Sequence, residues 1–255
     1  MTSNIYDKMV SEVEPFWAVD VGNTSTQFAY YDGRRFRKTF SVLTNEVRPL
    51  FRSRWGLTPQ ANVVIASVVP PIGAFLRKNI RAKLRLNAYL IGMDLSVPIV
   101  NKYRNPKQVG VDRLLNAVAA YKERPQELII VDFGTAITFD VVSKKGEYLG
   151  GAIVPGIRLS AEALFLKTAL LPEINIRAPK NPIGKTTQDS ILSGLFYGYG
   201  ALCQGLIDLL AIQVKARPKV VMTGGHTQLM KKFVSPKIRI IDEHLVLKGL
   251  YLLAL

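Results

Sequence analysis

The fold is decided by a stretch that occurs twice, as FWAVDVGNTSTQFAYYDGRRFRKTF at residues 16–40 and as LIIVDFGTAITFDVVSKKGEYLGGAIV at residues 128–154. Each copy begins with an apolar strand that ends in Asp-x-Gly. It continues through small hydroxyl or amide residues into a second strand. It then turns at a glycine into a third strand, through a hairpin at Asp32-Gly33 in the first copy and at Lys145-Gly146 in the second. The repeat therefore places Asp20 and Asp132 at equivalent positions of one structural unit.

The chain after each copy alternates helices and strands, which predicts an α/β protein. After the first copy we expect helices at 46–54 and 72–86 and strands at 62–69 and 87–93. After the second copy we expect helices at 156–171 and 187–215, and a strand, a glycine turn and a helix within 218–233. Two similar lobes then face each other, with Asp20 and Asp132 on either side of a cleft. We place a tail at 1–15, an N-terminal domain at 16–108 and a C-terminal domain at 109–255.

The composition is that of an ordinary globular protein. Of the 255 residues, 48% are hydrophobic and 21% are charged, which excludes collagen, a coiled coil and a disordered tail protein. At roughly 150 residues per domain, the length suits one large or two small domains. The single cysteine, Cys203, excludes a disulfide framework, and its apolar surroundings favour a buried thiol over a nucleophile. We therefore expect a reducing, cytoplasmic setting.

The chain is strongly basic, with 34 Lys and Arg against 19 Asp and Glu and a net charge of +15, so its surface attracts anions. The basic residues are dispersed, and those at 77–85 flank an apolar stripe with helical spacing. Because no basic segment is interleaved with aromatic residues, we do not expect nucleic-acid binding. The uncharged run between Asp189 and Asp208 contains too many polar residues and glycines for a membrane span and predicts a buried helix. The acidic N-terminal segment is not a secretory signal.

The two Asp-x-Gly turns have the features of phosphate-binding hairpins. In a P-loop or Rossmann site a helix follows the first strand directly, whereas here a second strand follows. Gly22 and Gly134 let backbone amides approach a phosphate, and Asn23, Thr24 and Thr135 add side-chain donors. Because carboxylates repel phosphates, the aspartates of both turns require cations between them and a triphosphate. The alternative is that each tripeptide only forms a turn.

Two other segments carry possible phosphate signals. VVMTGGH places Gly224 and Gly225 between a strand and a helix, where bare backbone can lie against a nucleotide ring. GKT at 184–186 resembles the end of a Walker A loop, but Pro179 stands where that loop needs a glycine, and no buried strand precedes it. We therefore reject a P-loop and expect Thr186 or its neighbour to cap the long helix.

A further chemical candidate is GVDR at 110–113, at the start of a predicted amphipathic helix. Asp112 in the first turn is favoured by the helix dipole, so end-capping is the simple interpretation. Arg113 is not favoured there, and an adjacent acid and arginine suit a site that deprotonates a hydroxyl while holding a carboxylate. Zinc and serine hydrolysis are disfavoured, because His226 and His244 lack metal-ligand spacing and HExxH, CxxC and GxSxG do not occur.

Taken in order, these segments resemble the motifs of the type III pantothenate kinase family, within the sugar kinase and actin superfamily. The matching blocks are DVGNT at 20–24, GVDR at 110–113, DFGTAITFD at 132–140, GGAIVPG at 150–156, IGKTT at 183–187, SGLFYGYG at 193–200 and TGG at 223–225. The resemblance implies two ribonuclease H-like (actin-like ATPase) domains with mixed β-sheets flanked by helices. It also implies ATP-dependent phosphorylation of pantothenate to 4'-phosphopantothenate, the first committed step towards coenzyme A.

The resemblance assigns roles by position. It implies that Asp112 is the catalytic base and that pantothenate contacts Tyr103, Gly110, Val111, Asp112, Arg113 and Thr187. ATP contacts are assigned to Asp20, Gly22, Asn23, Thr24 and Thr135, to which we add Gly224 and Gly225. Asp132 would hold a monovalent cation, K⁺ or NH₄⁺, and Asp20 would meet the Mg²⁺ of ATP through water. Members of the family are homodimers, so a homodimer is expected.

Two alternatives stay open. One is a kinase for another small hydroxylated metabolite, such as a sugar, although the segment 103–113 lacks a polar row for several sugar hydroxyls. The other is a non-catalytic, nucleotide-binding transcriptional accessory factor that uses the basic surface, as some relatives are named. The presence of both Asp112 and Asp132 argues against this second alternative.

Overall fold

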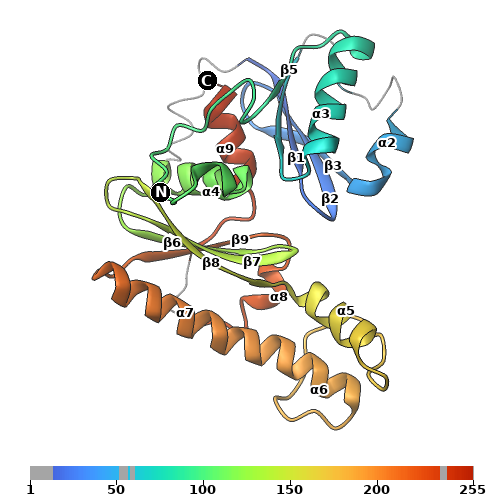
Figure 1. Cartoon of the computed structure of the whole chain (residues 1–255), viewed down its shortest axis with the longest axis vertical. Helices are drawn as coiled ribbons and strands as arrows, with labels where there is room; N and C mark the ends of the chain where they lie inside the picture. The colour runs from blue at the N-terminus through green and yellow to red at the C-terminus, as the bar shows by residue number, and fades with distance from the viewer. Residues whose placement is uncertain (1–13, 52–56, 58–60, 236–239, 255) are drawn as a thin grey trace. The chain divides into compact units, whose positions relative to one another are not determined.

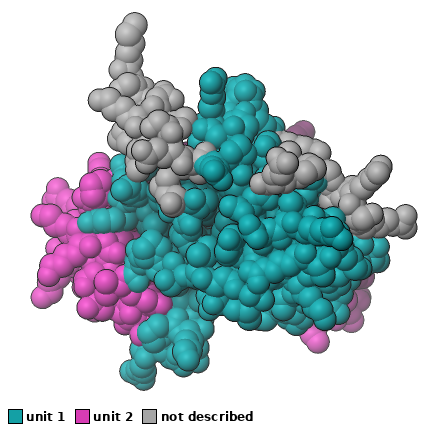
Figure 2. All heavy atoms as spheres, turned by 90° about the horizontal axis from the view of Figure 1, so that it is seen from above, with its two compact units in different colours: residues 1–99, 104–123, 245–255 teal, residues 100–103, 124–244 magenta. Residues whose placement is uncertain are grey.

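A computed structural model of the chain describes residues 14–51, 57, 61–235 and 240–254. Most of the predicted tail, and the end of the helix predicted at 46–54, lie outside the described residues. The chain forms two compact units, coloured separately in Figure 2. Unit 1 takes residues 1–99, 104–123 and 245–255, and unit 2 takes residues 100–103 and 124–244.

Unit 1 is built on a five-stranded sheet of order β3-β2-β1-β4-β5. Its strands are β1 (Phe16–Val21), β2 (Ser25–Tyr31), β3 (Phe36–Leu43), β4 (Asn62–Ser67) and β5 (Ala88–Leu90). The order mixes directions, because β1 pairs antiparallel with β2 and parallel with β4. A turn at Asp32-Gly33 joins β2 to β3, as the sequence predicts, and Gly33 has a positive φ of 92°.

Helices cover both faces of this sheet (Figure 1). The helices of this unit are α2 (Val47–Leu50), α3 (Pro70–Asn79) with its π-helical end Ile80–Leu84, α4 (Val111–Glu123) and α9 (Leu245–Ala254). Two short 3₁₀ turns, Thr44–Glu46 and Pro106–Gln108, lie between these elements in the chain. Because side chains alternate along a strand, Trp17 and Val19 of β1 pack with α3, whereas Phe16 and Ala18 pack with α4 and α9. Each face therefore has its own apolar core.

Unit 2 repeats the same sheet, with strands in the order β10-β9-β6-β7-β8. Its strands are β6 (Leu128–Phe133), β7 (Ala136–Val142), β8 (Tyr148–Pro155), β9 (Lys219–Thr223) and β10 (Ile240–Ile241). Its helices are α5 (Ile157–Lys167), α6 (Thr187–Ser193), a π-helical stretch (Gly194–Gly198), α7 (Tyr199–Val214) and α8 (Thr227–Met230). In each unit the Asp-x-Gly strand lies in the middle, next to its hairpin partner. The internal repeat, and with it the predicted α/β class with two mixed sheets, is confirmed.

The compact units interleave along the chain, whereas the sequence analysis made each domain continuous. Helices α4 and α9 follow residue 109, yet they pack against the sheet of unit 1. Their contact is close, because a Cβ on Gly249 of α9 would lie 2.7 Å from the carbonyl oxygen of Leu115 of α4. An ion pair of 2.6 Å joins Lys248 to Glu123. The compact units are defined by contacts in space, and the predicted boundary separates the two copies of the repeat along the sequence. The boundary at 109 therefore stays a prediction.

The long helical stretch Thr187–Val214 differs from its predicted environment. The sequence analysis expects it to be buried, but only 28% of its most apolar 18-residue window is buried within the chain. The window has a mean hydropathy of 1.4, so this helix is apolar and long enough to cross a membrane by length and composition alone. The expectation that it is too polar for a span is therefore wrong, since scattered glycines hardly lower a mean hydropathy. Core helices of soluble proteins pass the same test.

Candidate active site

The first Asp-x-Gly turn lies between β1 and β2 of unit 1. Asp20 is the next-to-last residue of β1, and the Gly22 amide donates to the Ser25 carbonyl oxygen over 3.0 Å, which closes the turn. Asn23 and Thr24 at the tip are exposed. A Cβ on Gly22 would lie 3.0 Å from the Ser25 carbonyl oxygen, so the turn is tight. The predicted donors thus occupy the accessible side of one short loop.

A buried threonine that the sequence analysis did not single out holds this loop from behind. The Thr44 hydroxyl donates to the Gly22 carbonyl oxygen over 2.7 Å. The Thr44 amide donates to the Thr24 carbonyl oxygen over 3.0 Å. The hydroxyl of Thr26, which is also buried, lies 3.1 Å from the Thr44 hydroxyl. No motif marks Thr44, because it follows β3 and reaches the loop only through the folded sheet.

GVDR forms the start of α4, also in unit 1. The carboxylate of Asp112 accepts a hydrogen bond from the Arg113 amide over 2.8 Å, and Arg113 is buried. A Cβ on Gly110 would lie 2.5 Å from Asp112 Oδ1, so a side chain there would require the Asp112 carboxylate to move. The first turn of a helix favours the charged form of a carboxylate. The hydrogen bond from the Arg113 amide therefore fixes the orientation of the Asp112 carboxylate.

The GVDR turn lies next to the first Asp-x-Gly loop within unit 1. The Cβ position of Gly110 is 3.5 Å from a methyl group of Val68, which follows β4. The amide of Val68 donates over 3.0 Å to the carbonyl oxygen of Val21, the residue after Asp20. Unit 1 thus brings the candidate base and the first loop to the same end of its sheet.

The second Asp-x-Gly turn joins β6 to β7 in unit 2, with Asp132 opposite Thr138 and Thr223 on the neighbouring strands. Its Gly134 amide donates to the Ala136 carbonyl oxygen over 3.2 Å, two residues on, whereas the Gly22 amide donates to the residue three positions on. Thr135 at the tip is exposed. The two turns therefore agree in topology, and each is closed by the amide of its glycine, but the second loop is one residue shorter.

Main-chain groups hold the second loop from behind. The amide of Gly156, at the start of α5, donates to the Thr135 carbonyl oxygen over 3.0 Å. A Cβ on Gly156 would overlap that oxygen and lie 2.6 Å from the Gly134 carbonyl oxygen. Gly156 ends the GGAIVPG block but received no role from the sequence. Its position in that block was the available signal.

The TGG turn after β9 also contacts the second loop. Gly224 has a φ of 93°, and a Cβ there would overlap Asp132 Oδ1 and lie 2.7 Å from the Phe133 backbone. Gly225 is exposed and has nothing within 4 Å of its Cβ position. The sequence predicts that the backbone of both glycines lies against a nucleotide ring. Packing against Asp132 is sufficient to require Gly224, so a ring contact there stays a prediction.

His226 completes the support of the second loop. Its amide donates to the Phe133 carbonyl oxygen over 3.1 Å. Burial lowers the pKa of the His226 side chain, and the positive charge of Arg158 on α5 lowers that pKa further. A neutral imidazole therefore lies beside the loop near neutral pH.

The two remaining predicted substrate contacts lie elsewhere in unit 2. Tyr103 ends the segment Val100–Tyr103, which runs beside β8. Thr187 is the exposed first residue of α6. The cap of that helix is Thr186, whose hydroxyl accepts from the Asp189 amide over 3.1 Å, as one of the two sequence alternatives predicted.

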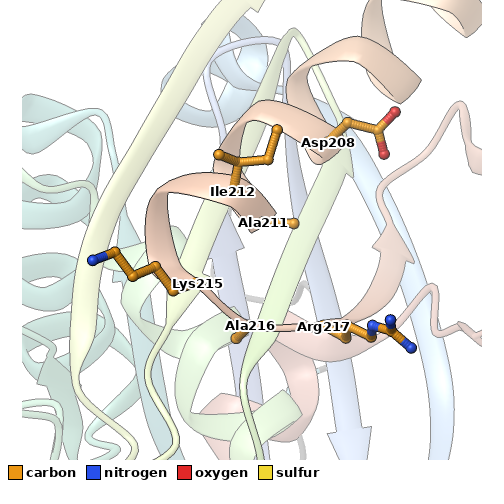
Figure 3. Close-up of a pocket in the computed structure, with 6 residues that line it drawn as sticks. All are labelled: Asp208, Ala211, Ile212, Lys215, Ala216 and Arg217. Atoms are coloured by element: carbon orange, nitrogen blue, oxygen red, sulfur yellow. The ribbon is translucent and has the colours of Figure 1, made fainter.

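A shallow concavity of about 700 Å³ lies away from these loops, at the end of α7 (Figure 3). It is lined by Asp208, Ala211, Ile212, Lys215, Ala216 and Arg217. The side chains of Lys215 and Arg217 extend in opposite directions in Figure 3, so their charges do not converge on one ligand. None of the predicted site residues lines it. Among the residues that the structure describes, no group of three His, Cys, Asp or Glu side chains is placed to hold a metal ion.

Comparison with known proteins decides the family. A family model for type III pantothenate kinase matches residues 16–209. The chain belongs to the type III pantothenate kinase family. A type III pantothenate kinase of Anaeromyxobacter sp. (strain K) is 42% identical over 248 residues, covering 92% of this chain and 97% of the relative. The type III pantothenate kinase of Persephonella marina is 41% identical over 245 residues, covering 91% and 95%.

Solved structures agree on the fold of this type III pantothenate kinase family member. A Campylobacter jejuni protein assigned to the Baf family of transcriptional activators has a TM-score of 0.62 at 19% identity, covering 93% of this chain and 96% of its own. A Sinorhizobium meliloti protein assigned as a 2-dehydro-3-deoxygalactonokinase has a TM-score of 0.55 at 11% identity, covering 94% and 98%. These likenesses show that the chain shares its overall fold with both proteins.

Proposed function

We infer that the chain transfers the γ-phosphoryl group of ATP to the primary hydroxyl of pantothenate and yields 4'-phosphopantothenate. The observation that carries this function is the match to the type III pantothenate kinase family over residues 16–209. The repeated Asp-x-Gly turns support it, because phosphoryl transfer needs positioned phosphates and charge neutralisation more than covalent chemistry. The enzyme acts in coenzyme A biosynthesis, and we propose a cytoplasmic location.

One assay tests the function against both alternatives. ATP consumption is measured with pantothenate and with a panel of sugars, and DNA binding is measured at physiological salt. Turnover with pantothenate alone supports the proposal. Turnover with a sugar in its place identifies another metabolite kinase, and DNA binding without turnover identifies a regulator. Either of these two outcomes overturns the proposal.

For the chemical step we propose that Asp112 accepts the proton of the pantothenate hydroxyl as the oxygen attacks the γ-phosphorus. Its place at the start of α4 and the hydrogen bond from the Arg113 amide support this role. We propose that Tyr103, Gly110, Val111, Arg113 and Thr187 bind pantothenate, with Arg113 on the carboxylate. A positioned base contributes roughly 10²- to 10⁴-fold to such reactions.

For the nucleotide we propose contacts from both Asp-x-Gly loops. The first loop supplies Asp20, Gly22, Asn23 and Thr24, and the second loop supplies Thr135. Exposed donors at both tips and the turn-closing hydrogen bonds support this assignment. We add Gly224 and Gly225 as a surface for the nucleotide ring, and the open space around Gly225 supports the second of these.

The residues present fit the expected cations. Mg²⁺ commonly takes one or two carboxylates from the protein and further oxygens from substrate phosphates, so a single Asp20, acting through water, suffices. Asp132 has the hydroxyl-bearing residues Thr138 and Thr223 opposite it, and oxygen donors of this kind suit K⁺ or NH₄⁺. When bound, these cations neutralise charge on the phosphates.

We also propose a homodimer that covers the exposed apolar residues of unit 2. The exposed side chains include Leu159, Phe165, Leu166, Leu170, Ile183, Leu202, Leu209 and Ile212. Large exposed apolar patches mark interaction sites. Sedimentation of the variant Ile212→Lys tests the proposal, with Met93→Lys, an equally exposed apolar residue of unit 1, as the control. A dimer that dissociates only in Ile212→Lys supports it, and an unchanged dimer or a wild-type monomer overturns it.

A further inference from the structure

The segment that carries Tyr103 is bound to the edge strand of unit 2. Residues 100–103 leave unit 1 and pair with β8 before the chain returns to unit 1 at residue 104. The Tyr148 amide donates to the Val100 carbonyl oxygen over 2.9 Å, and the Lys102 amide donates to the Tyr148 carbonyl oxygen over 2.8 Å. The Tyr103 amide donates to Asn101 Oδ1 over 3.0 Å. The backbone on both sides of Asn101 is thus fixed to one residue, Tyr148.

The side chain of Tyr148 is itself fixed by a buried carboxyl group. Its hydroxyl donates to Asp140 Oδ1 over 2.7 Å, and both residues have no exposed surface. The Thr138 hydroxyl donates to Asp140 Oδ2 over 3.0 Å. Burying a carboxyl group in a sheet is costly unless donors surround it, and a satisfied buried network specifies one arrangement. Asp140 ends the DFGTAITFD block, and neither the sequence nor the proposed mechanism gives it a role.

A bulge in β8 then places bare backbone beneath the Tyr103 ring. Val141 pairs with Gly150 and Val142 pairs with Tyr148, so Leu149 is the extra residue. Gly150 has a φ of 118°, which L side chains rarely adopt, and its Cβ position lies 3.4 Å from the Tyr103 ring. The rings of Tyr103 and Tyr148 also lie beside each other, with centroids 6.4 Å apart.

We propose that Asp140, Tyr148 and Gly150 are positioning residues for Tyr103, so that the buried Asp140–Tyr148 hydrogen bond sets the affinity for pantothenate. The inference rests on the proposed substrate-binding role of Tyr103. Tyr148 fixes the backbone of the segment, Asp140 fixes Tyr148, and Gly150 leaves room for the ring. None of the three needs to touch substrate, since each acts through Tyr103.

The test is the variant Tyr148→Phe, which keeps the ring and removes one hydroxyl. We expect the KM for pantothenate to rise roughly three- to tenfold, because a buried hydrogen bond is lost, Asp140 keeps one donor fewer, and the Tyr103 segment is then held less firmly. The KM for ATP and the dependence on K⁺ should stay within twofold. That second readout matters because Thr138, the other donor to Asp140, lies opposite Asp132.

A double-mutant cycle separates positioning from a general loss of stability. In the background Tyr103→Ala, the change Tyr148→Phe should leave the KM for pantothenate unaltered, because the residue through which it acts is gone. Tyr89→Phe on β5 of unit 1 is the matched hydroxyl deletion and should leave all constants unchanged. Additive effects in the cycle, equal rises for ATP and pantothenate, or a lowered melting temperature with an unchanged KM would each overturn the inference.

A structural readout keeps this inference distinct from the proposed function. A crystal structure of Tyr148→Phe reports the position of the Tyr103 ring without any substrate. If the wild type does not turn over pantothenate but the Tyr103 ring is displaced in Tyr148→Phe, the proposed function is contradicted and the positioning is supported. An unmoved ring in an active enzyme with unchanged KM contradicts the positioning and leaves the function standing.

Discussion

The two Asp-x-Gly loops share a topology but are held in place by different chemistry. In unit 1 the side chain of Thr44 donates to the Gly22 carbonyl oxygen. In unit 2 the backbone amide of Gly156 donates to the Thr135 carbonyl oxygen, and Gly224 packs directly against Asp132. Both loops thus accept a hydrogen bond from a backbone amide, that of Thr44 or of Gly156, but only the first is also held by a hydroxyl, and only the second has glycines packed behind it.

This difference predicts how the loops tolerate change. A hydroxyl contributes one hydrogen bond, and its loss leaves the surrounding space unchanged when the replacement has the same shape. A glycine whose Cβ position is filled by backbone has no such replacement, because backbone atoms move only with the strands that carry them. The units also differ in their candidate chemistry, since the candidate base Asp112 belongs to unit 1.

The largest expected effect comes from removing that base while both loops stay intact. We expect Asp112→Asn to lower kcat by roughly 10²- to 10⁴-fold, because the hydroxyl of pantothenate loses its proton acceptor. ATP should still bind, which isothermal titration measures. Glu162→Gln, an exposed carboxylate on α5, loses the same charge and should keep normal turnover. Near-normal activity in Asp112→Asn would mean that Asp112 is not the base, and that the two units do not differ in this respect.

A paired glycine substitution tests the difference in bracing. We expect Gly156→Ala to lower the free energy of unfolding by about 3 kcal/mol or more, because its Cβ would overlap backbone oxygens on two residues. Gly22→Ala should cost about 1 kcal/mol, since a single oxygen lies 3.0 Å away. Urea unfolding measures both.

The control for this pair is Gly205→Ala on α7, where nothing lies within 4 Å of the Cβ position. Alanine should stabilise that helix by roughly 0.5–1 kcal/mol. If Gly22→Ala and Gly156→Ala cost the same, the proposed difference between side-chain and backbone bracing is wrong.

The sequence predicted what depends on neighbours along the chain. The hairpins at Asp32-Gly33 and Lys145-Gly146, the Thr186 cap and most helices follow from turn chemistry, capping and periodicity, and the structure confirms them. The helix predicted from residue 72 begins at Pro70, because proline is favoured in the first turn of a helix. The equivalence of the two Asp-x-Gly strands was recognised because a repeat is visible without any structure.

Sequence reasoning missed what depends on contacts between distant segments. Thr44 braces a loop some twenty residues before it, and α9 joins a unit whose other residues end at 123. The roles of Gly156 and Tyr148 likewise depend on strand register, which no local pattern reveals. The long helix was expected to be buried because its run is uncharged yet too polar for a membrane span, and composition alone does not say whether both faces of a helix find partners.

Replacing the aspartate of each loop by asparagine tests whether the two loops hold different cations. At fixed Mg²⁺, we expect Asp132→Asn to weaken activation by K⁺ by roughly 10- to 100-fold or more. Changing a residue that only supports a metal ligand already lowers metal affinity by that factor. Asp20→Asn should instead raise the KM for ATP and the Mg²⁺ requirement. A K⁺ titration of both variants distinguishes them. An unchanged K⁺ dependence in Asp132→Asn contradicts the assignment of the cation to the second loop.

A smaller effect is expected from Thr44→Val, which removes the hydroxyl behind the first loop and keeps the shape. The loss of one hydrogen bond should lower the free energy of unfolding by about 1 kcal/mol and raise the KM for ATP a few-fold. The variant Thr44→Ser keeps the hydroxyl and should restore the KM for ATP, although it lacks the methyl group. Failure of serine to restore it would mean that Thr44 acts through packing alone.

The smallest expected effect concerns pH and the second loop only. Burial and Arg158 lower the pKa of His226 below its ordinary value of 6.5. As pH falls, the unfolded chain therefore binds a proton at His226 before the folded chain does. The stability that comes from the neutral His226 side chain is complete above pH 6.5 and is lost as pH falls towards the folded pKa. Urea unfolding between pH 7.5 and 5.5 should show a steeper loss of stability for the wild type than for His226→Gln. Equal slopes would mean that the side chain of His226 titrates without influence on the loop, and that the main-chain bond from its amide is the whole of its contribution.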